Sequence, residues 1–444
     1  MSQENGLYYT RCHDGKVTYH DKVENVQFEI PEEDFAGLML GQKMPSFEGA
    51  NGCLDALRNP ISSHTISQLV REKHAKTVSI IVSDGTRGVP TNAVSGLIIE
   101  ELLAAGVKLE DILFIVATGL HRAANEAEYR ALVDEKYYGR VRMISSDAFD
   151  ETANVNIGTS ARGTPIDVNR QAYACDLHIS IGKAAFHGMA GFSGGRKSVL
   201  PGICSYRTIC GNHTPQMITD RGTCRGVLEG NPFHEEMLEA ARMYRIDFCV
   251  TFVMNDENKI AGVFAGELNE SHQAACNFIK KYADIKLPEK ADIYFVTTGA
   301  PFNVNFYQAS RAMRMIDRCI DENTVVAFYA GCPEGIMADQ MMMPFDHSHS
   351  VEEAEKWMWS HWDPRMDDTL FHIKTLKTNA KFVCYSPGVE RAAFEKMHCH
   401  GADSYEDLLH QAYKLSGKAH PRVIFFPMLH KISFRIGQQS ASVK

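Results

Sequence analysis

Two short segments of this chain set arginine, and in one of them histidine, beside small residues, in patterns that suit proton transfer and the binding of an anion. They are SDGTR at 83–87 and ATGLHR at 117–122, and a second histidine-bearing stretch, FHGMAGFSGGRKS, follows at 186–198. Histidine is the side chain best able to take and return a proton near neutral pH. His121 and His187 on opposite sides of one carbon would serve a reaction that inverts that centre, with one base for each face.

The glycine-rich loop GFSGGRKS at 191–198 nearly matches the phosphate-binding pattern GxxxxGK[ST]. Arg196 stands where that pattern needs its second glycine, which lets backbone N–H groups wrap the phosphates. The sequence therefore disfavours a nucleoside triphosphatase. Two interpretations stay open: a loose anion-binding nest, or glycines used for close packing beside an exposed Lys197.

Arg87, Arg122 and Arg311 are candidates for binding a carboxylate, because a guanidinium fork matches a carboxylate with two hydrogen bonds. For any one of them, a surface ion pair is the plainer interpretation. Tyr307 and Gln308 precede Arg311 in NFYQASRAM, which indicates the start of a helix. The spacing of three puts Gln308 and Arg311 on the same side of that helix.

The elements that would position these residues are buried strands. Near-continuous apolar runs at 78–84, 112–118 and 177–181 alternate with a helical pattern over 92–105. This order is typical of a parallel sheet covered on both faces. Ligands of such sheets bind outside the carboxyl ends of the strands, where all three polar segments lie.

The length of 444 residues favours two domains. A hairpin is expected over 248–266, a linker at 287–289, and a second α/β unit with strands near 292–299, 324–331, 380–386 and 422–427. We therefore expect two α/β domains with mostly parallel sheets and an active-site cleft between them. The domains would cover 1–285 and 286–427, with a tail at 428–444 able to pack back on the first.

The composition narrows the class of protein. A net charge of −9 argues against a nucleic-acid binder. Neither an export signal nor an apolar run long enough for a membrane span is visible, and twelve scattered cysteines fit reduced thiols in the cytoplasm. His347, His349 and the run at 398–400 are expected to be surface residues and not a metal site.

The motif set resembles one known family. DGTR at 84–87, TGLHR at 118–122, the stretch from His187 to Lys197, the pair at 212–213 and YQASR at 307–311 are similar in order and spacing to the lactate racemase (LarA) family. The likeness runs from about 80 to 315, and the glycine-loop segment is its most specific part.

The resemblance implies a cofactor: a nickel-pincer nucleotide, Ni(II) pyridinium-3,5-bisthiocarboxylic acid mononucleotide. It implies that Lys197 is tethered to one arm as a thioamide and that His213 is the fourth ligand of a square-planar nickel. It implies His121 and His187 as the two general acid/bases. It implies cofactor contacts from the DGTR residues Asp84, Gly85, Thr86 and Arg87.

The resemblance also implies a reaction. Arg87, Tyr307, Gln308 and Arg311 would contact a small 2-hydroxy acid. Its Cα hydrogen would leave as a hydride and return to either face, which makes the protein a racemase or epimerase. Cofactor biosynthesis proteins would be needed for maturation. The sequence gives no oligomeric state.

Two positions depart from the family pattern. Arg311 stands where lactate-acting members have a lysine, and Phe371 falls where the family has a tryptophan near the cofactor. Both departures favour an acid longer or more polar than lactate, such as malate or a sugar acid. The alternatives are a non-catalytic relative that binds nickel or the cofactor, and a phosphate-binding enzyme of ordinary nucleotide chemistry.

Overall fold

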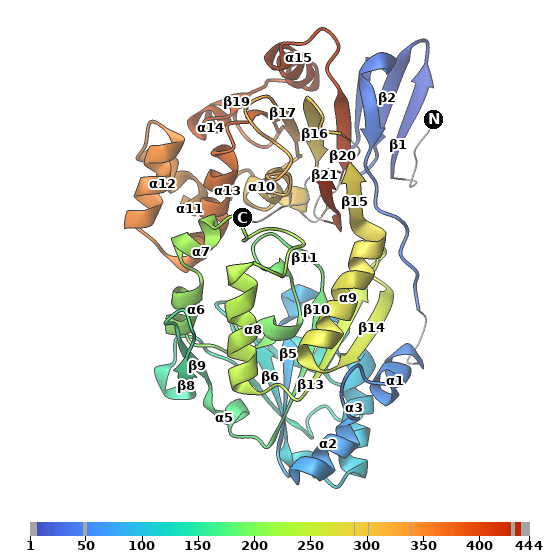
Figure 1. The fold of residues 1–444 in the computed structure, drawn as a ribbon, viewed down its shortest axis with the longest axis vertical. Helices are drawn as coiled ribbons and strands as arrows, with labels where there is room; N and C mark the ends of the chain where they lie inside the picture. Colours follow the sequence, from blue (N-terminus) through green and yellow to red (C-terminus); the bar gives the residue numbers. More distant parts are fainter. Residues whose placement is uncertain are drawn as a thin grey trace. The chain divides into compact units, whose positions relative to one another are not determined.

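The computed structural model describes residues 7–47, 51–287, 289–300, 302–337, 339–427 and 431–436. These residues form two compact units (Figure 1). Unit 1 comprises the described residues of 1–42 and 283–444, and unit 2 those of 43–282. Each unit is built on a large, mostly parallel sheet with helices, which confirms the expected α/β class.

Unit 2 is organised around a six-stranded sheet in the order β14-β13-β10-β5-β6-β7. All neighbours are parallel except β13 and β14, which form the expected hairpin. The strands are β5 (Val78–Ser83), β6 (Ile112–Ala117), β7 (Arg142–Ser145), β10 (Leu177–Ala184), β13 (Phe248–Met254) and β14 (Ile260–Gly266).

The apolar runs that predicted these strands are the core of unit 2. Val78, Ile80 and Val82 of β5 point into one buried cluster with side chains of the first four helices. These helices are α1 (Asn51–Arg58), α2 (Ile66–Lys73), α3 (Asn92–Ala104) and α4 (Glu126–Leu132). Because both faces of the sheet are covered, its central strands β5 and β6 are buried along nearly their whole length and do not alternate between buried and exposed residues.

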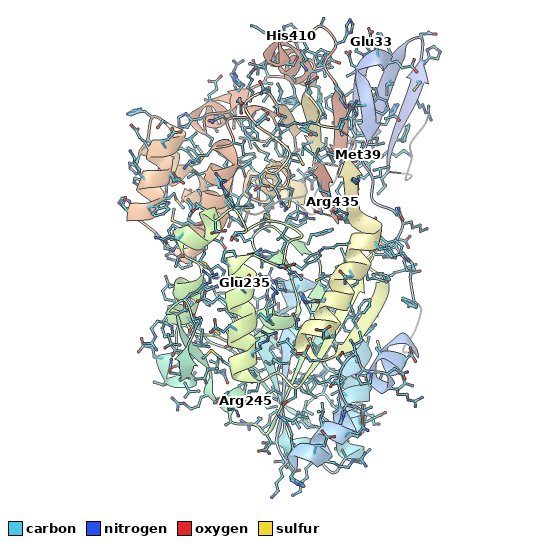
Figure 2. The ribbon with its side chains drawn as sticks, in the orientation of Figure 1. Glu33, Met39, Glu235, Arg245, His410 and Arg435 are labelled. Atoms are coloured by element: carbon cyan, nitrogen blue, oxygen red, sulfur yellow. The ribbon has the colours of Figure 1, made fainter. Side chains whose placement is uncertain are left out.

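Unit 2 has five further helices among its described residues. Helix α5 (Arg170–Tyr173) precedes the glycine loop, and α6 (Tyr206–Asn212), α7 (Pro215–Thr219), α8 (Pro232–Tyr244) and α9 (Leu268–Ala283) follow it. Figure 1 draws α8 and α9 in front of the strands. Glu235 and Arg245, labelled in Figure 2, mark the two ends of α8. A small antiparallel pair, β8 (Asn154–Thr159) and β9 (Pro165–Asn169), packs beside α6.

The strand order of unit 2 reverses between β5 and β10. From β5 the chain continues outward through β6 and β7, and β10 then pairs on the other side of β5. Such a reversal opens a crevice at the carboxyl ends of the two central strands. The segments after β5, β6 and β10, which are far apart in the sequence, therefore meet at one edge.

Unit 1 has a six-stranded parallel sheet in the order β19-β18-β17-β16-β20-β4. Its strands are β4 (Phe35–Leu38), β16 (Ile293–Thr297), β17 (Val325–Tyr329), β18 (Lys381–Tyr385), β19 (His400–Gly401) and β20 (Val423–Pro427). Its helices are α10 (Phe306–Arg314), α11 (Asp339–Asp346), α12 (Val351–Ser360), α13 (Asp367–Leu376), α14 (Arg391–Lys396) and α15 (Tyr405–Ser416).

The first 42 residues differ from the expected domain division, because they belong to unit 1. The antiparallel strands β1 (Tyr8–His13), β2 (Lys16–Asp21) and β3 (Val26–Pro31) turn an apolar face onto the second sheet. The Phe28 ring lies 4.1 Å from that of Phe295, and β4 extends the sheet by pairing with β20. The other limit, between 282 and 283, lies close to the expected boundary at 285.

The expected linker also contains regular structure. Residues Asp284–Leu287 form β15, which pairs in parallel with β21 (Ser433–Ile436) inside unit 1. Residue 288 lies outside the described residues, as do 428–430 and 437–444 of the expected tail. Among the described residues, no helix is long and apolar enough to cross a lipid bilayer.

Candidate functional site

Asp84 is the centre of a polar cluster at the end of β5. It is buried and caps the short turn Gly85–Arg87, where it accepts hydrogen bonds from the Thr86 backbone N–H (2.8 Å) and the Thr86 hydroxyl. His121 Nδ1, from the turn after β6, lies 3.2 Å from the same carboxylate. The two turns are brought together because β5 and β6 are parallel neighbours.

The charge of Asp84 fixes the orientation of His121. Burial alone would raise the pKa of Asp84, but the hydrogen bonds from His121 and Thr86 outweigh it and lower that pKa to about 2. An ionised Asp84 accepts the Nδ1–H of His121, which leaves the lone pair of the neutral ring on Nε2. Arg87 Nη2 lies 3.3 Å from that Nε2. A ring nitrogen with a lone pair and a guanidinium group are therefore adjacent.

A cavity of about 350 Å³ lies beside Asp84, lined in part by Gly85, Asn125 and Glu128. It falls at the lower end of the range for small-molecule pockets. A Cβ at Gly85 would lie 3.1 Å from the Glu128 side chain, so this glycine keeps the turn close to α4.

Arg122 was a candidate for binding the carboxylate of a ligand, but in the structure it binds a carboxylate of the protein itself. Its guanidinium makes two hydrogen bonds with the Glu128 carboxylate, at 2.7 and 2.8 Å. This fork-to-fork pair uses the geometry that a substrate carboxylate would need. The plainer interpretation, an ion pair, therefore describes Arg122.

His187 and Lys197 form the second polar cluster. His187 lies in the small hairpin of β11 (Phe186–His187) and β12 (Gly191–Phe192), and Lys197 lies in the turn Gly195–Ser198. Lys197 Nζ is 3.0 Å from His187 Nε2. The backbone N–H groups of Met189 and Ala190 donate to His187 Nδ1, at 3.3 and 3.1 Å.

The glycine loop is shaped by close packing and by Arg196. A Cβ at Gly191, whose φ is +72°, would lie 2.0 Å from the carbonyl oxygen of Val227. The Arg196 side chain is buried, and it donates to the carbonyl of Ala190 (2.6 Å) and contacts His272 Nε2 (2.9 Å). Arg196 therefore supports the loop from inside, in the position where a phosphate-binding loop has glycine.

His213 is the buried residue that ends α6. Burial, together with the nearby positive charge of Lys197, lowers its pKa to about 3, so the ring is neutral at physiological pH. Its Nδ1 lies 3.3 Å from the Ile209 carbonyl oxygen, which favours a proton on Nδ1 and a lone pair on Nε2. A neutral imidazole is the form in which histidine binds metals, so the predicted role of His213 is compatible with this position.

Tyr307, Gln308 and Arg311 lie on α10 of unit 1, and the Asn305 side chain caps that helix. Asp368 binds Arg311 through Nε (3.2 Å) and Nη2 (2.5 Å). The Nη1 of Arg311 makes no hydrogen bond with any residue that the structure describes. The same Asp368 accepts from Arg314 Nη1 at 2.6 Å, so one carboxylate holds two guanidinium groups.

Two residues of these clusters were missed in the sequence. Asp368 lies 57 positions from Arg311, and no local signal links them. Lys183, the last residue but one of β10, is half-buried, and its ammonium lies near Gly88 of the neighbouring turn and makes no ion pair with a described residue. Burial and the charge of Arg87 lower its pKa. A lysine at a strand end was visible in ISIGK and is a signal that could have been used.

The remaining histidine and cysteine candidates do not assemble. Over the described ranges, no three His, Cys, Asp or Glu side chains are grouped so that they could hold a metal ion. His347 instead stacks on Trp357, with ring centroids 5.5 Å apart. All twelve cysteines are free thiols.

A mostly parallel sheet whose strand order reverses, with polar side chains after its central strands, is typical of ligand-binding α/β proteins. Comparison with known proteins identifies the family. The family model for the lactate racemase N-terminal domain matches residues 19–224, and that for the lactate racemase C-terminal domain matches 287–428. The chain belongs to the lactate racemase family, which confirms the resemblance, and it is an enzyme of the isomerase class.

Individual relatives agree with this assignment. The lactate racemase of Lactiplantibacillus plantarum is 32% identical over 323 residues, 71% of this chain and 74% of the relative. That of Thermoanaerobacterium thermosaccharolyticum is 30% identical over 342 residues, 76% of each chain.

Solved structures show the same fold. The lactate racemase apoprotein from T. thermosaccharolyticum has a TM-score of 0.83 at 26% identity, covering 92% of this chain and 97% of that one. A structural-genomics protein from Thermotoga maritima has a TM-score of 0.60 at 17% identity, covering 83% and 96%, and shares the fold.

Proposed function

We propose that this chain racemises or epimerises a lactate-like 2-hydroxy acid by reversible hydride transfer to a nickel-pincer nucleotide. The observation that carries the proposal is the Asp84–His121–Arg87 arrangement at the edge where the strand order reverses. Family membership adds the reaction class, because the curated relatives are lactate racemases.

In this proposal His121 is the first acid/base. Its Nε2 lone pair takes the proton of the substrate 2-hydroxyl, and the Asp84 carboxylate stabilises the imidazolium that forms. Arg87 lies 3.3 Å from the same nitrogen, so a carboxylate bound by Arg87 sets the neighbouring hydroxyl beside His121. His187 serves the opposite face.

The residues at this edge also suit the cofactor. The DGTR residues Asp84, Gly85, Thr86 and Arg87 would line it, Lys197 would be tethered to one arm, and His213 would bind nickel through Nε2. When bound, such a cofactor accepts the Cα hydrogen of the substrate as a hydride and returns it to either face.

Unit 1 would contribute the substrate contacts of Tyr307, Gln308 and Arg311. Asp368 holds the Nε and Nη2 of Arg311, which orients the remaining Nη1. A guanidinium held in this way suits an acid with a polar or anionic group beyond the 2-hydroxyl. We therefore place malate and sugar acids beside lactate as candidate substrates.

The test uses cofactor-loaded protein and single enantiomers of lactate, malate and gluconate in D₂O. Chiral analysis and proton NMR should show inversion with the original hydrogen kept at Cα. Deuterium at Cα would mean that a base removes a proton directly, which contradicts hydride transfer.

The alternative is a relative that binds nickel or the cofactor without catalysis. Nickel content and activity of His121→Gln and His187→Gln separate the two. An enzyme should lose at least about a hundredfold in activity with nickel retained, because general acid–base catalysis contributes on that order. A binding protein would show no activity to lose.

Maturation and location belong to the same proposal. Protein made in a host without the cofactor biosynthesis proteins is expected to be unloaded and inactive. Twelve free cysteines fit a reducing compartment, and we infer the cytoplasm.

A further inference from the structure

Lys183 is a half-buried cation at the edge where the strand order of unit 2 reverses. It is the last residue but one of β10, and its ammonium lies near Gly88, in the segment that follows the neighbouring strand β5. This ammonium makes no hydrogen bond and no ion pair with any residue that the structure describes. Burying a charge without a compensating partner is unfavourable, so the position of Lys183 indicates a partner other than the described residues.

The glycine loop fixes the position of Lys183 through its backbone. The Ser193 hydroxyl donates to the Lys183 carbonyl oxygen at 2.8 Å, and a Cβ at Gly194 would lie 2.9 Å from the same oxygen. The loop packs this closely because residue 194 is glycine. At the other end of the lysine, a Cβ at Gly88 would lie 3.9 Å from Nζ, so a longer side chain there could cover the ammonium. The lysine is thus held by its main chain, and residue 88 leaves its charged end uncovered.

The charged neighbour of Lys183 is Arg87, which has the same sign. The charge of Arg87, together with burial, lowers the pKa of the Lys183 ammonium. The acid of this edge is already engaged, because Asp84 accepts hydrogen bonds from Thr86 and His121. Its carboxylate also lies 3.6 Å from Nε of Arg87. The edge therefore carries two neighbouring cations, and Lys183 has no counter-ion among the described residues.

We propose that Lys183 binds a second carboxylate of the substrate, so that the preferred 2-hydroxy acid of this protein is a dicarboxylate of the malate type. This inference rests on the proposed function, in which Arg87 binds the carboxylate next to the reacting carbon. Arg87 Nη2 lies 3.3 Å from His121 Nε2, so that carboxylate and the 2-hydroxyl occupy Arg87 and His121. A monocarboxylate such as lactate or gluconate leaves the charge of Lys183 unmatched, whereas the distal carboxylate of malate neutralises it.

The two cations differ in the geometry that they recognise. The guanidinium fork of Arg87 suits two carboxylate oxygens held in one orientation, as a carboxylate next to the reacting carbon must be. The ammonium of Lys183 is a compact charge on a flexible stem, and it binds an anion from a range of directions. Such a contact suits a carboxylate that lies beyond the reacting carbon and takes no part in the reaction. Lys183 is therefore a residue of substrate specificity and not a catalytic one.

The first test compares malate with lactate on cofactor-loaded protein. The parent protein should convert malate with the higher kcat/KM. Lys183→Met, which keeps a long side chain and removes its charge, should lower the ratio of malate to lactate kcat/KM by at least about tenfold, because a hydrogen bond to a charged group is lost. The loss should appear in KM, since the distal contact is the same in the ground and transition states. Equal losses for both acids, or a parent preference for lactate, would overturn the proposal.

Two further variants test whether a cation at this position is the cause. Lys183→Arg keeps a positive charge and should recover part of the malate-to-lactate ratio. Lys76→Met is the matched control, because Lys76 is exposed and precedes β5, at the end of that strand away from Gly88. It should keep the parent ratio. A ratio that falls as far in Lys76→Met as in Lys183→Met would contradict a local contact.

Stability separates a ligand contact from a contact that holds the fold. Without ligand, Lys183→Met should unfold at a urea concentration no lower than the parent protein, because it removes a half-buried charge that no described residue neutralises. Malate should raise the unfolding midpoint of the parent protein more than that of the variant, since a ligand stabilises the state that binds it. A variant that unfolds at clearly lower urea concentration without ligand would assign Lys183 to the fold and overturn the proposal.

A binding measurement judges the inference even if the loaded protein inverts neither acid, in which case the proposed function fails. Lysine acetylation by succinimidyl acetate, read by mass spectrometry of the peptides, reports which ammonium groups a ligand covers. Malate added to loaded protein should protect Lys183 and leave Lys76 unprotected, whereas lactate should protect neither. Absence of protection by malate would overturn the inference. Protection on loading with cofactor alone would also overturn it, because the ammonium would then belong to the cofactor phosphate.

Discussion

At the scale of single residues, the site depends on a few side chains whose partners fix their protonation. The Asp84 carboxylate accepts a hydrogen bond from Nδ1 of His121, whereas Nδ1 of His187 accepts hydrogen bonds from two backbone N–H groups. The two histidines thus have opposite tautomers. Two histidines that look equivalent in the sequence therefore differ in the ring nitrogen that carries the proton.

The stability that Asp84 provides is testable through pH. Its folded pKa of about 2 lies below the ordinary 3.8, so its ionised form contributes about 2 kcal/mol above pH 4, which is lost as pH falls towards 2. Asp84→Asn should therefore unfold at a lower urea concentration than the parent protein at pH 7. The difference between the two unfolding midpoints should disappear towards pH 2.5. A difference in midpoint that does not change with pH would mean that the charge of Asp84 is not the source of its stabilising effect.

Several residues of the candidate site could be predicted from the sequence, whereas their distant partners could not, for a physical reason. His121, His187 and Lys197 were recognised because glycines and strand ends mark them in the sequence. The buried position of Arg196 and the Asp368 partner of Arg311 were not, because both depend on contacts between segments far apart in the sequence. The contact of His121 with Asp84 likewise depends on the pairing of β5 with β6.

At the scale of elements, two glycines show two different reasons for having no side chain: a close approach to another segment, and a backbone turn. Gly191 and Gly139 both have positive φ, +72° and +74°. A Cβ at Gly191 would strike the Val227 carbonyl, whereas a Cβ at Gly139 would meet nothing within 4 Å. Comparing alanine at these two positions therefore separates the cost of placing a side chain at positive φ from the cost of a steric clash.

We expect Gly139→Ala to cost about 1 kcal/mol, the usual penalty of a left-handed residue. Gly191→Ala should cost at least about 3 kcal/mol, because β12 must also move away from Val227. Urea unfolding of the two variants measures both. Equal losses would show that the loop shifts freely and that the close approach is not needed.

The helix pair α10 and α13 depends on Asp368. Burial alone would raise the pKa of this carboxyl, but the charges of Arg314 and Arg311 outweigh burial and hold that pKa well below its usual range. Asp368→Asn leaves the buried Arg314 without a compensating charge and should cost about 3–5 kcal/mol.

Asp367→Asn is the matched control for that change. Burial and the charge of Asp368 raise the pKa of Asp367, so its ionised form destabilises the fold as pH rises. The control should therefore be neutral or stabilising at pH 8, as thermal unfolding would show. A large loss in Asp367→Asn would contradict the assigned direction.

At the scale of the whole molecule, the chain crosses between its units twice. Unit 2 is one continuous segment, whereas unit 1 needs residues from both ends of the chain. The sequence predicted the second crossing within a few residues, because apolar strands resume there. It did not predict the first, because a strand-rich start gives no indication of which distant sheet it will join.

This connectivity predicts which fragments fold. Residues 43–282 should fold alone, because their core draws only on that segment. Residues 283–444 should not, since the edge strand β4 and the face of β2 and β3 would be missing. Near-UV circular dichroism and cooperative unfolding distinguish the cases.

A permuted fragment, 283–444 joined through a Gly/Ser linker to 1–42, is the control and should recover a cooperative transition. Cooperative unfolding of 283–444 alone would contradict the prediction.

The pairing of β4 with β20 also has a consequence for synthesis. Strand β4 leaves the ribosome early, but its partner follows some 400 residues later. The residues His121, His187, Lys197 and His213 all lie in the middle segment, which can fold long before then. Strand β4 therefore stays without its partner until β20 has been synthesised.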